Sequence, residues 1–134
     1  MTLKATIVVG NPKPQSRTLE VAKSLTDKLL VPGTYMLEII DLADHVAEIF
    51  AWPSDEMAAL NARVAESDLV VFASPTYKAT YTGLLKAFLD RYPANGLAGV
   101  TGGVEFGEEG LERRAAAVDV QVAAGVIGQG PAKG

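Results

Sequence analysis

The chain has 134 residues, 49% of them hydrophobic, and a formal net charge of -4. This length is typical of one compact domain, so we expect residues 1–134 to form a single domain with its own apolar core. The sequence contains no cysteine, which excludes disulfide scaffolds, thiolate metal sites and dithiol redox chemistry; any redox activity must therefore depend on a cofactor. The acidic balance, without a run of basic residues, argues against nucleic acid as a partner.

The N-terminal residues lack the charged start, long apolar middle and cleavage site of a signal peptide. No apolar stretch approaches the roughly 20 residues that a membrane-spanning helix needs. These features predict a cytoplasmic protein that has no membrane partner.

The first part of the chain alternates apolar strands with amphipathic helices. Residues 5–9 are a continuous apolar run rich in β-branched side chains, which predicts a strand buried on both faces. Over residues 19–29, apolar side chains recur every three or four positions, which predicts a helix that Ser16 or Thr18 caps. Residues 35–41 alternate and predict a second strand, nearer to an edge of the sheet.

The same alternation continues to about residue 93. A loop over residues 42–52 precedes a second helix, for which Ser54 is the expected N-cap. Residues 69–73 predict a third, fully apolar strand, and the apolar stripe within residues 84–89 predicts a third helix that ends near Pro93. Strands and helices that alternate over short connections are typical of an α/β protein with a parallel sheet.

The pattern weakens after Leu97. Nine of the 13 glycines lie from Gly99 onward, and glycine disfavours both helix and strand interiors. We expect a fourth strand around residues 99–101 and a helix over residues 112–124, and no fifth strand is evident.

Ligands of an open parallel sheet bind beyond the carboxyl ends of its strands, so a site is expected in the loops that follow the first and third strands. The first loop, residues 10–18, places Ser16, Arg17 and Thr18 at the start of a helix. Two hydroxyls, a guanidinium and the free N–H groups of a helix N-terminus suit a phosphate dianion. A helix cap with a solvated charge explains the same residues equally well, and the loop matches neither the Walker pattern nor G-x-G-x-x-G.

The second loop, residues 74–83, places Tyr77, Tyr81 and several hydroxyls at the same edge of the sheet. Aromatic rings beside hydroxyls suit a flat polar heterocycle with a polyol chain. The alternative is an ordinary strand-to-helix connection whose turn begins at a proline.

Together the two loops resemble the NADPH-dependent FMN reductase family, a branch of the flavodoxin-like proteins. The resemblance rests on G-N-P to S-R-T in the first loop and, more specifically, on S-P-T-Y-K-x-x-Y-x-G-x-L-K over residues 74–86. It covers about residues 4–97. It implies a flavodoxin-like three-layer sandwich with a parallel sheet of order 2-1-3-4-5.

The resemblance also implies roles for individual residues. Ser16, Arg17 and Thr18 would hold the phosphate of FMN, and the second loop would line its ribityl chain and ring. Tyr81 resembles an extra aromatic residue of two-component FMN reductases, at a point where the helix tends to bulge and to form a subunit contact. The implied cofactor-binding residues are Asn11, Ser16, Arg17, Thr18, Pro75, Thr76, Tyr77, Lys78, Tyr81, Thr101, Gly102 and Gly103.

The C-terminal part departs from the family pattern. The third flavin loop of the family follows the fourth strand and contains a Thr-Gly-Gly-Ser-like turn; the match here is Thr101-Gly102-Gly103, followed by Val104 instead of serine. Residues 115–119 resemble the start of the family's last helix, but glycine-rich sequence replaces the apolar strand expected near it. Family members are longer, so this part of the chain is shortened or divergent.

The implied activity is hydride transfer from NADPH or NADH to FMN, with flavin and nicotinamide as small-molecule substrates. The resemblance also implies a homodimer or homotetramer, and a flavin-dependent monooxygenase as a partner. Two alternatives stay open: a reductase of quinones, azo compounds or metal oxyanions that keeps its FMN bound, and a non-catalytic FMN-binding protein or electron carrier.

No catalytic side chain is expected, because the cofactor carries the chemistry. His45 is expected to be a surface loop residue. Asp41 and Asp44 have no third ligand spaced nearby, so no metal site is expected. Trp52 is expected to pack beneath the second helix rather than to cover the flavin or the nicotinamide.

Overall fold

A computed structural model of the chain describes residues 2–93 and 96–106. Its described part contains one parallel sheet of four strands in the order β2-β1-β3-β4. The α/β class and the parallel sheet are confirmed, and these strands take the first four places of the expected order. The strands are β1 (Leu3–Val9), β2 (Tyr35–Asp41), β3 (Leu69–Ser74) and β4 (Thr101–Phe106).

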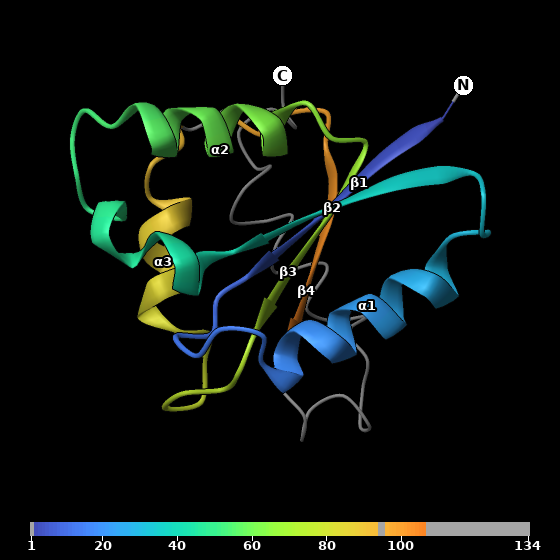
Figure 1. Ribbon diagram of the computed structural model, residues 1–134, viewed down its shortest axis with the longest axis horizontal. Helices are drawn as coiled ribbons and strands as arrows, with labels where there is room; N and C mark the ends of the chain where they lie inside the picture. Colours follow the sequence, from blue (N-terminus) through green and yellow to red (C-terminus); the bar gives the residue numbers. More distant parts are fainter. Residues whose placement is uncertain (1, 94–95, 107–134) are drawn as a thin grey trace.

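The helices cover both faces of the sheet (Figure 1). Side-chain oxygens of Ser16, Ser54 and Thr82 accept the N–H of the third residue beyond each of them, which fixes where three of the helices begin. Ser16, rather than Thr18, is therefore the cap of the first helix. The helices are α1 (Arg17–Leu29), the 3-10 helix η1 (Leu42–Glu48), α2 (Asp55–Ala65) and α3 (Gly83–Leu89).

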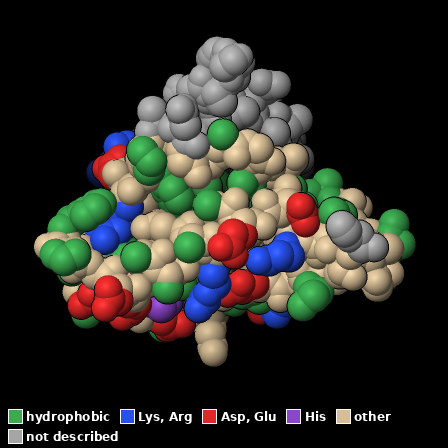
Figure 2. All heavy atoms as spheres, turned by 90° about the horizontal axis from the view of Figure 1, so that it is seen from above, with side chains coloured by type: hydrophobic (Ala, Val, Ile, Leu, Met, Phe, Trp, Pro, Cys, Tyr) green, Lys and Arg blue, Asp and Glu red, His purple; other side chains and the backbone are tan. Residues whose placement is uncertain are grey.

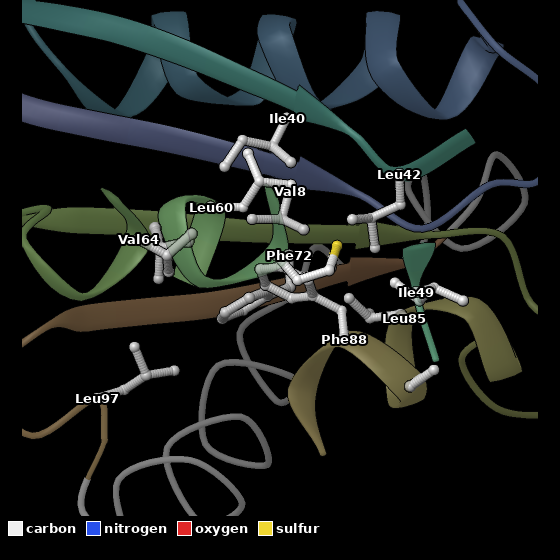
Figure 3. Packing of buried hydrophobic residues seen from close by; sticks show 13 residues of the cluster. Val8, Ile40, Leu42, Ile49, Leu60, Val64, Phe72, Leu85, Phe88 and Leu97 are labelled. Atoms are coloured by element: carbon white, nitrogen blue, oxygen red, sulfur yellow. The ribbon is translucent and has the colours of Figure 1, made fainter. Parts of the chain in front are cut away.

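Two apolar clusters hold the three layers together, one on each face of the sheet. Neighbouring residues of a strand point to opposite faces, so the continuous apolar runs of β1 and β3 supply both clusters, as expected. The smaller cluster packs Ile7, Val9 and Val71 against α1. The larger cluster joins Val8, Ile40 and Phe72 of the sheet to η1, α2 and α3, and to Leu97 (Figure 3).

The apolar stripe of α3 belongs to the larger cluster. Leu85 and Phe88 are fully buried in it, and Leu84 and Leu89 pack partly buried against it. The stripe therefore belongs to the core. It also anchors the helix that follows the second loop.

Three local expectations were wrong. Residues 42–48 form η1 rather than part of a loop, and the fourth strand runs over Thr101–Phe106 rather than around residues 99–101. Trp52 is 68% exposed, and the guanidinium carbon of Arg91 lies 4.1 Å from its ring centroid, so this side chain does not pack beneath α2. The helix expected over residues 112–124 lies outside the described residues. No helix within the described ranges is long and apolar enough to cross a membrane.

Candidate functional site

The first and second loops meet at the carboxyl edge of the sheet, because β1 and β3 are parallel neighbours. The Gly10 N–H donates to the carbonyl oxygen of Ala73 at 2.7 Å. The hydroxyl of Thr82 donates to the carbonyl oxygen of Gly10 at 2.6 Å, joining positions that are 72 residues apart. Both loops therefore lie side by side below α3 in Figure 1 and form one surface.

The first loop leaves β1 in close contact with α3. A Cβ atom at Gly10 would lie 2.7 Å from the Cβ of Leu85 and 3.3 Å from its Cα. Both Leu85 atoms are held by the helix and its core packing. Only glycine fits at this position, and its absence of a side chain lets the two loops approach each other.

The hydroxyls of Ser16 and Thr18 are buried at the N-terminus of α1. The Ser16 oxygen accepts the N–H of Leu19 at 3.4 Å, and the Thr18 oxygen accepts the side-chain amide of Asn11 at 3.0 Å. Since each oxygen acts as an acceptor inside the loop, the hydroxyl hydrogen remains to donate outward. Asn11 thus orients Thr18 at the start of the helix.

Some backbone donors of the first loop are used within the protein. The Lys13 N–H donates to the side-chain oxygen of Asn11 at 2.9 Å, and the Gln15 N–H donates to Asp41 at 3.0 Å. The two prolines of the loop have no N–H. These contacts fix the shape of the loop before the helix begins.

Four other N–H groups of the loop are unused, that of Asn11 and the three consecutive ones of Ser16, Arg17 and Thr18. None of them has a hydrogen-bond acceptor among the described residues. Three consecutive N–H groups at the positive end of a helix dipole, beside the exposed guanidinium of Arg17, form a donor set that suits a phosphate. The chemistry of this donor set fits the phosphate of FMN.

The second loop folds into a closed turn. Tyr77 and Thr80 exchange backbone hydrogen bonds at 2.8 and 3.1 Å, and the two residues between them have positive φ angles, 52° at Lys78 and 66° at Ala79. The ring of Tyr77 stands at this turn with the residue 49% exposed. The turn therefore presents an aromatic surface at the same edge as the first loop.

The start of the second loop is held by Ser74, which is fully buried. Its hydroxyl donates to the carbonyl oxygen of Pro75 at 2.8 Å and accepts the N–H of Thr82 at 3.0 Å. This serine closes the base of the loop, so Pro75 and Thr76 lead outward from a fixed point. Pro75 is half-buried and Thr76 is exposed.

Tyr81 lies between the turn and α3. Its side chain is half-buried and packs against the larger core cluster. The helix begins only at Gly83, after the Thr82 cap, and is α-helical over its described length. Tyr81 therefore precedes α3. The helical bulge that the resemblance implied at Tyr81 cannot lie within α3, because the helix begins two residues later.

Comparison with known proteins identifies the family of the chain. The family model of NADPH-dependent FMN reductases matches residues 3–129. The chain belongs to the NADPH-dependent FMN reductase family. An FMN reductase (NADPH) of Pseudomonas aeruginosa is 31% identical over 114 residues, which are 76% of this chain and 61% of that protein.

Solved structures show the same fold. The apo form of an NADH:FMN oxidoreductase superposes with a TM-score of 0.69 at 26% identity, over 81% of this chain and 61% of that one. An NAD(P)H:(acceptor) oxidoreductase of Paracoccus denitrificans superposes with a TM-score of 0.61 at 21% identity, over 82% of this chain and 63% of that one. This family member thus spans about three-fifths of the length of these relatives.

Thr101, Gly102 and Gly103, which the resemblance placed in a third flavin loop, lie in β4 instead. Thr101 pairs with Leu69 and Gly102 with Val70, so they and Gly103 lie at the amino end of β4. The first and second loops lie at the opposite, carboxyl end of the sheet. The expectation that these three residues form a loop after the fourth strand is wrong, because β4 starts at Thr101 and runs through both glycines. The segment after β4 lies outside the described residues.

The single histidine, His45, lies in η1 and contacts α2. The Nδ1 of His45 is 2.5 Å from a carboxylate oxygen of Glu56, and the imidazole, purple in Figure 2, sits among acidic side chains. His45 belongs to η1 and is half-buried, so it joins η1 to α2 rather than lying in a loop. Within residues 2–93 and 96–106, no three His, Asp or Glu side chains come together as metal ligands.

Sequence reasoning missed three residues that shape the site. Ser74 and Thr82 act through buried hydroxyls, and Asp41 acts through a carboxylate that reaches the first loop from β2. Each bond joins segments far apart in the chain or fixes a loop from within. The one available signal was position, since Asp41 and Ser74 end their strands at the edge where ligands bind.

Proposed function

We propose that this chain is an NAD(P)H-dependent FMN reductase whose first loop binds the FMN phosphate and whose second loop contacts the ribityl chain and the ring. Family membership and the flavodoxin-like fold support this activity. The observation that carries the proposal is the unused donor set of Ser16, Arg17 and Thr18 at the N-terminus of α1.

The binding residues fall into two groups. The phosphate group would be held by the backbone N–H groups and hydroxyls of Ser16 and Thr18 and by the guanidinium of Arg17, with Asn11 orienting Thr18. The flavin would be contacted by Pro75, Thr76, Tyr77, Lys78 and Tyr81. Thr101, Gly102 and Gly103 are not included, because they lie at the other end of the sheet.

The protein's part in the reaction is positional. When bound, FMN accepts hydride from the reduced nicotinamide and so supplies the redox chemistry. The first loop fixes the end of the cofactor that carries the phosphate, and the exposed ring of Tyr77 provides a face on which an aromatic system can pack. No side-chain acid or base is needed for this transfer.

A flavin titration tests the phosphate site. Loss of a charged hydrogen bond to the phosphate costs about 1.5–3 kcal/mol, so Arg17→Ala should weaken FMN binding by roughly 10- to 150-fold. Lys28→Ala is the matched control, because it removes one positive charge from the last turn of the same helix. Equal FMN affinity of the wild type and Arg17→Ala, measured by flavin fluorescence, would remove Arg17 from the site.

Nicotinamide oxidation distinguishes the reductase from its alternatives. Oxidation of NADPH or NADH that requires free FMN is expected. Oxidation with tightly bound FMN that requires an added quinone would favour a reductase of other acceptors, and no oxidation with either would favour a carrier or a non-catalytic binding protein.

The same proposal includes assembly into a homodimer or homotetramer. Val46, Phe50 and Trp52 are more than half exposed, and such apolar side chains are the kind of surface that an interface covers. Light scattering coupled to size exclusion measures the mass directly, and a monomer would contradict this part. The cytoplasmic location, the single domain and the monooxygenase partner stay predictions from the sequence.

A further inference from the structure

A buried carboxylate from a neighbouring strand contacts the first loop. Asp41 ends β2 and is 8% exposed. Its Oδ2 accepts the Gln15 N–H at 3.0 Å, while its Oδ1 is buried and has no partner among the described residues. One carboxylate oxygen therefore has no hydrogen bond within the described part of the chain, and the other accepts a single backbone N–H of the first loop.

This arrangement destabilises the fold, and Asp41 could make a more favourable hydrogen bond within its own segment. A buried charge with incomplete hydrogen bonding is destabilising. Asp41 is also the N-cap residue of η1, a position at which aspartate usually accepts an N–H of the helix. It makes no such bond here. The carboxylate is directed at the first loop instead of at its own helix.

The group that Asp41 holds is in an unusual conformation. Gln15 has a φ of 52°, in the left-handed region that residues other than glycine rarely adopt. Gln15 directly precedes Ser16, the cap of α1. The backbone direction at Gln15 therefore determines where the N–H groups of Ser16 and Arg17 point.

We propose that Asp41 is a positioning residue for phosphate recognition: by holding the Gln15 N–H, it keeps the left-handed backbone that aims the following N–H groups at the flavin phosphate. This inference rests on the proposed function and deepens it. It assigns the effect to the acceptor oxygen and not to the negative charge, because the negative charge of a carboxylate repels a phosphate.

The experiment compares FMN with riboflavin, which has the same ring and ribityl chain but no phosphate. Affinities for both are measured by flavin fluorescence. Wild type is expected to prefer FMN. Asp41→Ala should lose about tenfold of its FMN affinity, as for one charge-assisted hydrogen bond, and keep its riboflavin affinity within about twofold.

Two further variants separate positioning from charge and from folding. Asp41→Asn keeps an oxygen that can accept the Gln15 N–H, so its preference for FMN should survive even if its melting temperature falls. Asp44→Ala is the control, because it removes an exposed carboxylate from η1, three residues further on. Its preference should equal that of the wild type.

The outcomes distinguish this inference from the proposed function. A wild type without preference for FMN over riboflavin overturns the phosphate site and the inference with it. A wild type that prefers FMN, together with an Asp41→Ala that keeps the full preference, overturns the inference alone. Collapse of the preference in folded Asp41→Asn also overturns it, and this holds even if Asp41→Ala does not fold.

Discussion

Thr82 is the residue whose side chain joins the two loops, and replacing it with valine tests that bond. Valine has nearly the same shape but cannot donate to the Gly10 carbonyl or accept the Leu85 N–H, which Thr82 does at 2.6 and 3.1 Å. Loss of a helix cap costs about 1 kcal/mol, and a buried carbonyl left without a donor costs about 1–3 kcal/mol. We expect Thr82→Val to lose about 2–4 kcal/mol, a large part of the roughly 5–15 kcal/mol that holds a domain folded.

The assay is urea unfolding followed by circular dichroism, with Thr82→Ser as the matched variant. Serine keeps the hydroxyl and loses one buried methyl group, which costs about 1 kcal/mol. Thr82→Val should therefore unfold at clearly lower urea than Thr82→Ser, and it should also bind FMN more weakly because the loops separate. Equal midpoints for the two variants would show that the hydrogen bonds of Thr82 to Gly10 and Leu85 are together worth no more than the buried methyl group, about 1 kcal/mol, and the reasoning would fail.

Further predictions concern backbone positions in the same loops. Gly10→Ala should lose about 3 kcal/mol in urea unfolding, because its Cβ would meet Leu85 at 2.7 Å, whereas Gly83→Ala, with nothing within 4 Å, should be at least as stable as wild type. Ala79→Gly should gain about 0.5–1 kcal/mol in the same assay, since Ala79 has a φ of 66°. A loss of stability in Ala79→Gly would contradict strain at that turn.

Much of the fold could be predicted because its determinants are local. The alternating run over residues 35–41 coincides with β2, and Ser54 caps α2 as its position before two acidic residues indicated. The buried strands β1 and β3 were recognisable because parallel strands covered on both faces need apolar side chains on both. Each of these signals is contained within a single element.

The parts that could not be predicted depend on contacts between elements. The short helix η1 is interrupted at His45, whose backbone angles are non-helical, so it is not one regular helix. The strand β4 runs through two glycines because its backbone pairs with Val70 and Val71 of β3. The family resemblance implied a loop at these glycines, since pairing with a neighbour is invisible in the strand's own sequence.

The specificity of the first loop arises in the fold rather than in its short motif. A Ser-Arg-Thr sequence at a helix start is equally consistent with an ordinary cap. The proposal of an anion site depends on acceptors elsewhere in the protein, which occupy several of the neighbouring N–H groups: Asp41 accepts that of Gln15, Asn11 accepts that of Lys13, and Ala73 accepts that of Gly10. Among the donors left over, those of Ser16, Arg17 and Thr18 are adjacent and lie at one helix end, so a phosphate could meet several of them at once. A mutation in a neighbouring strand should therefore affect phosphate binding as strongly as one in the loop.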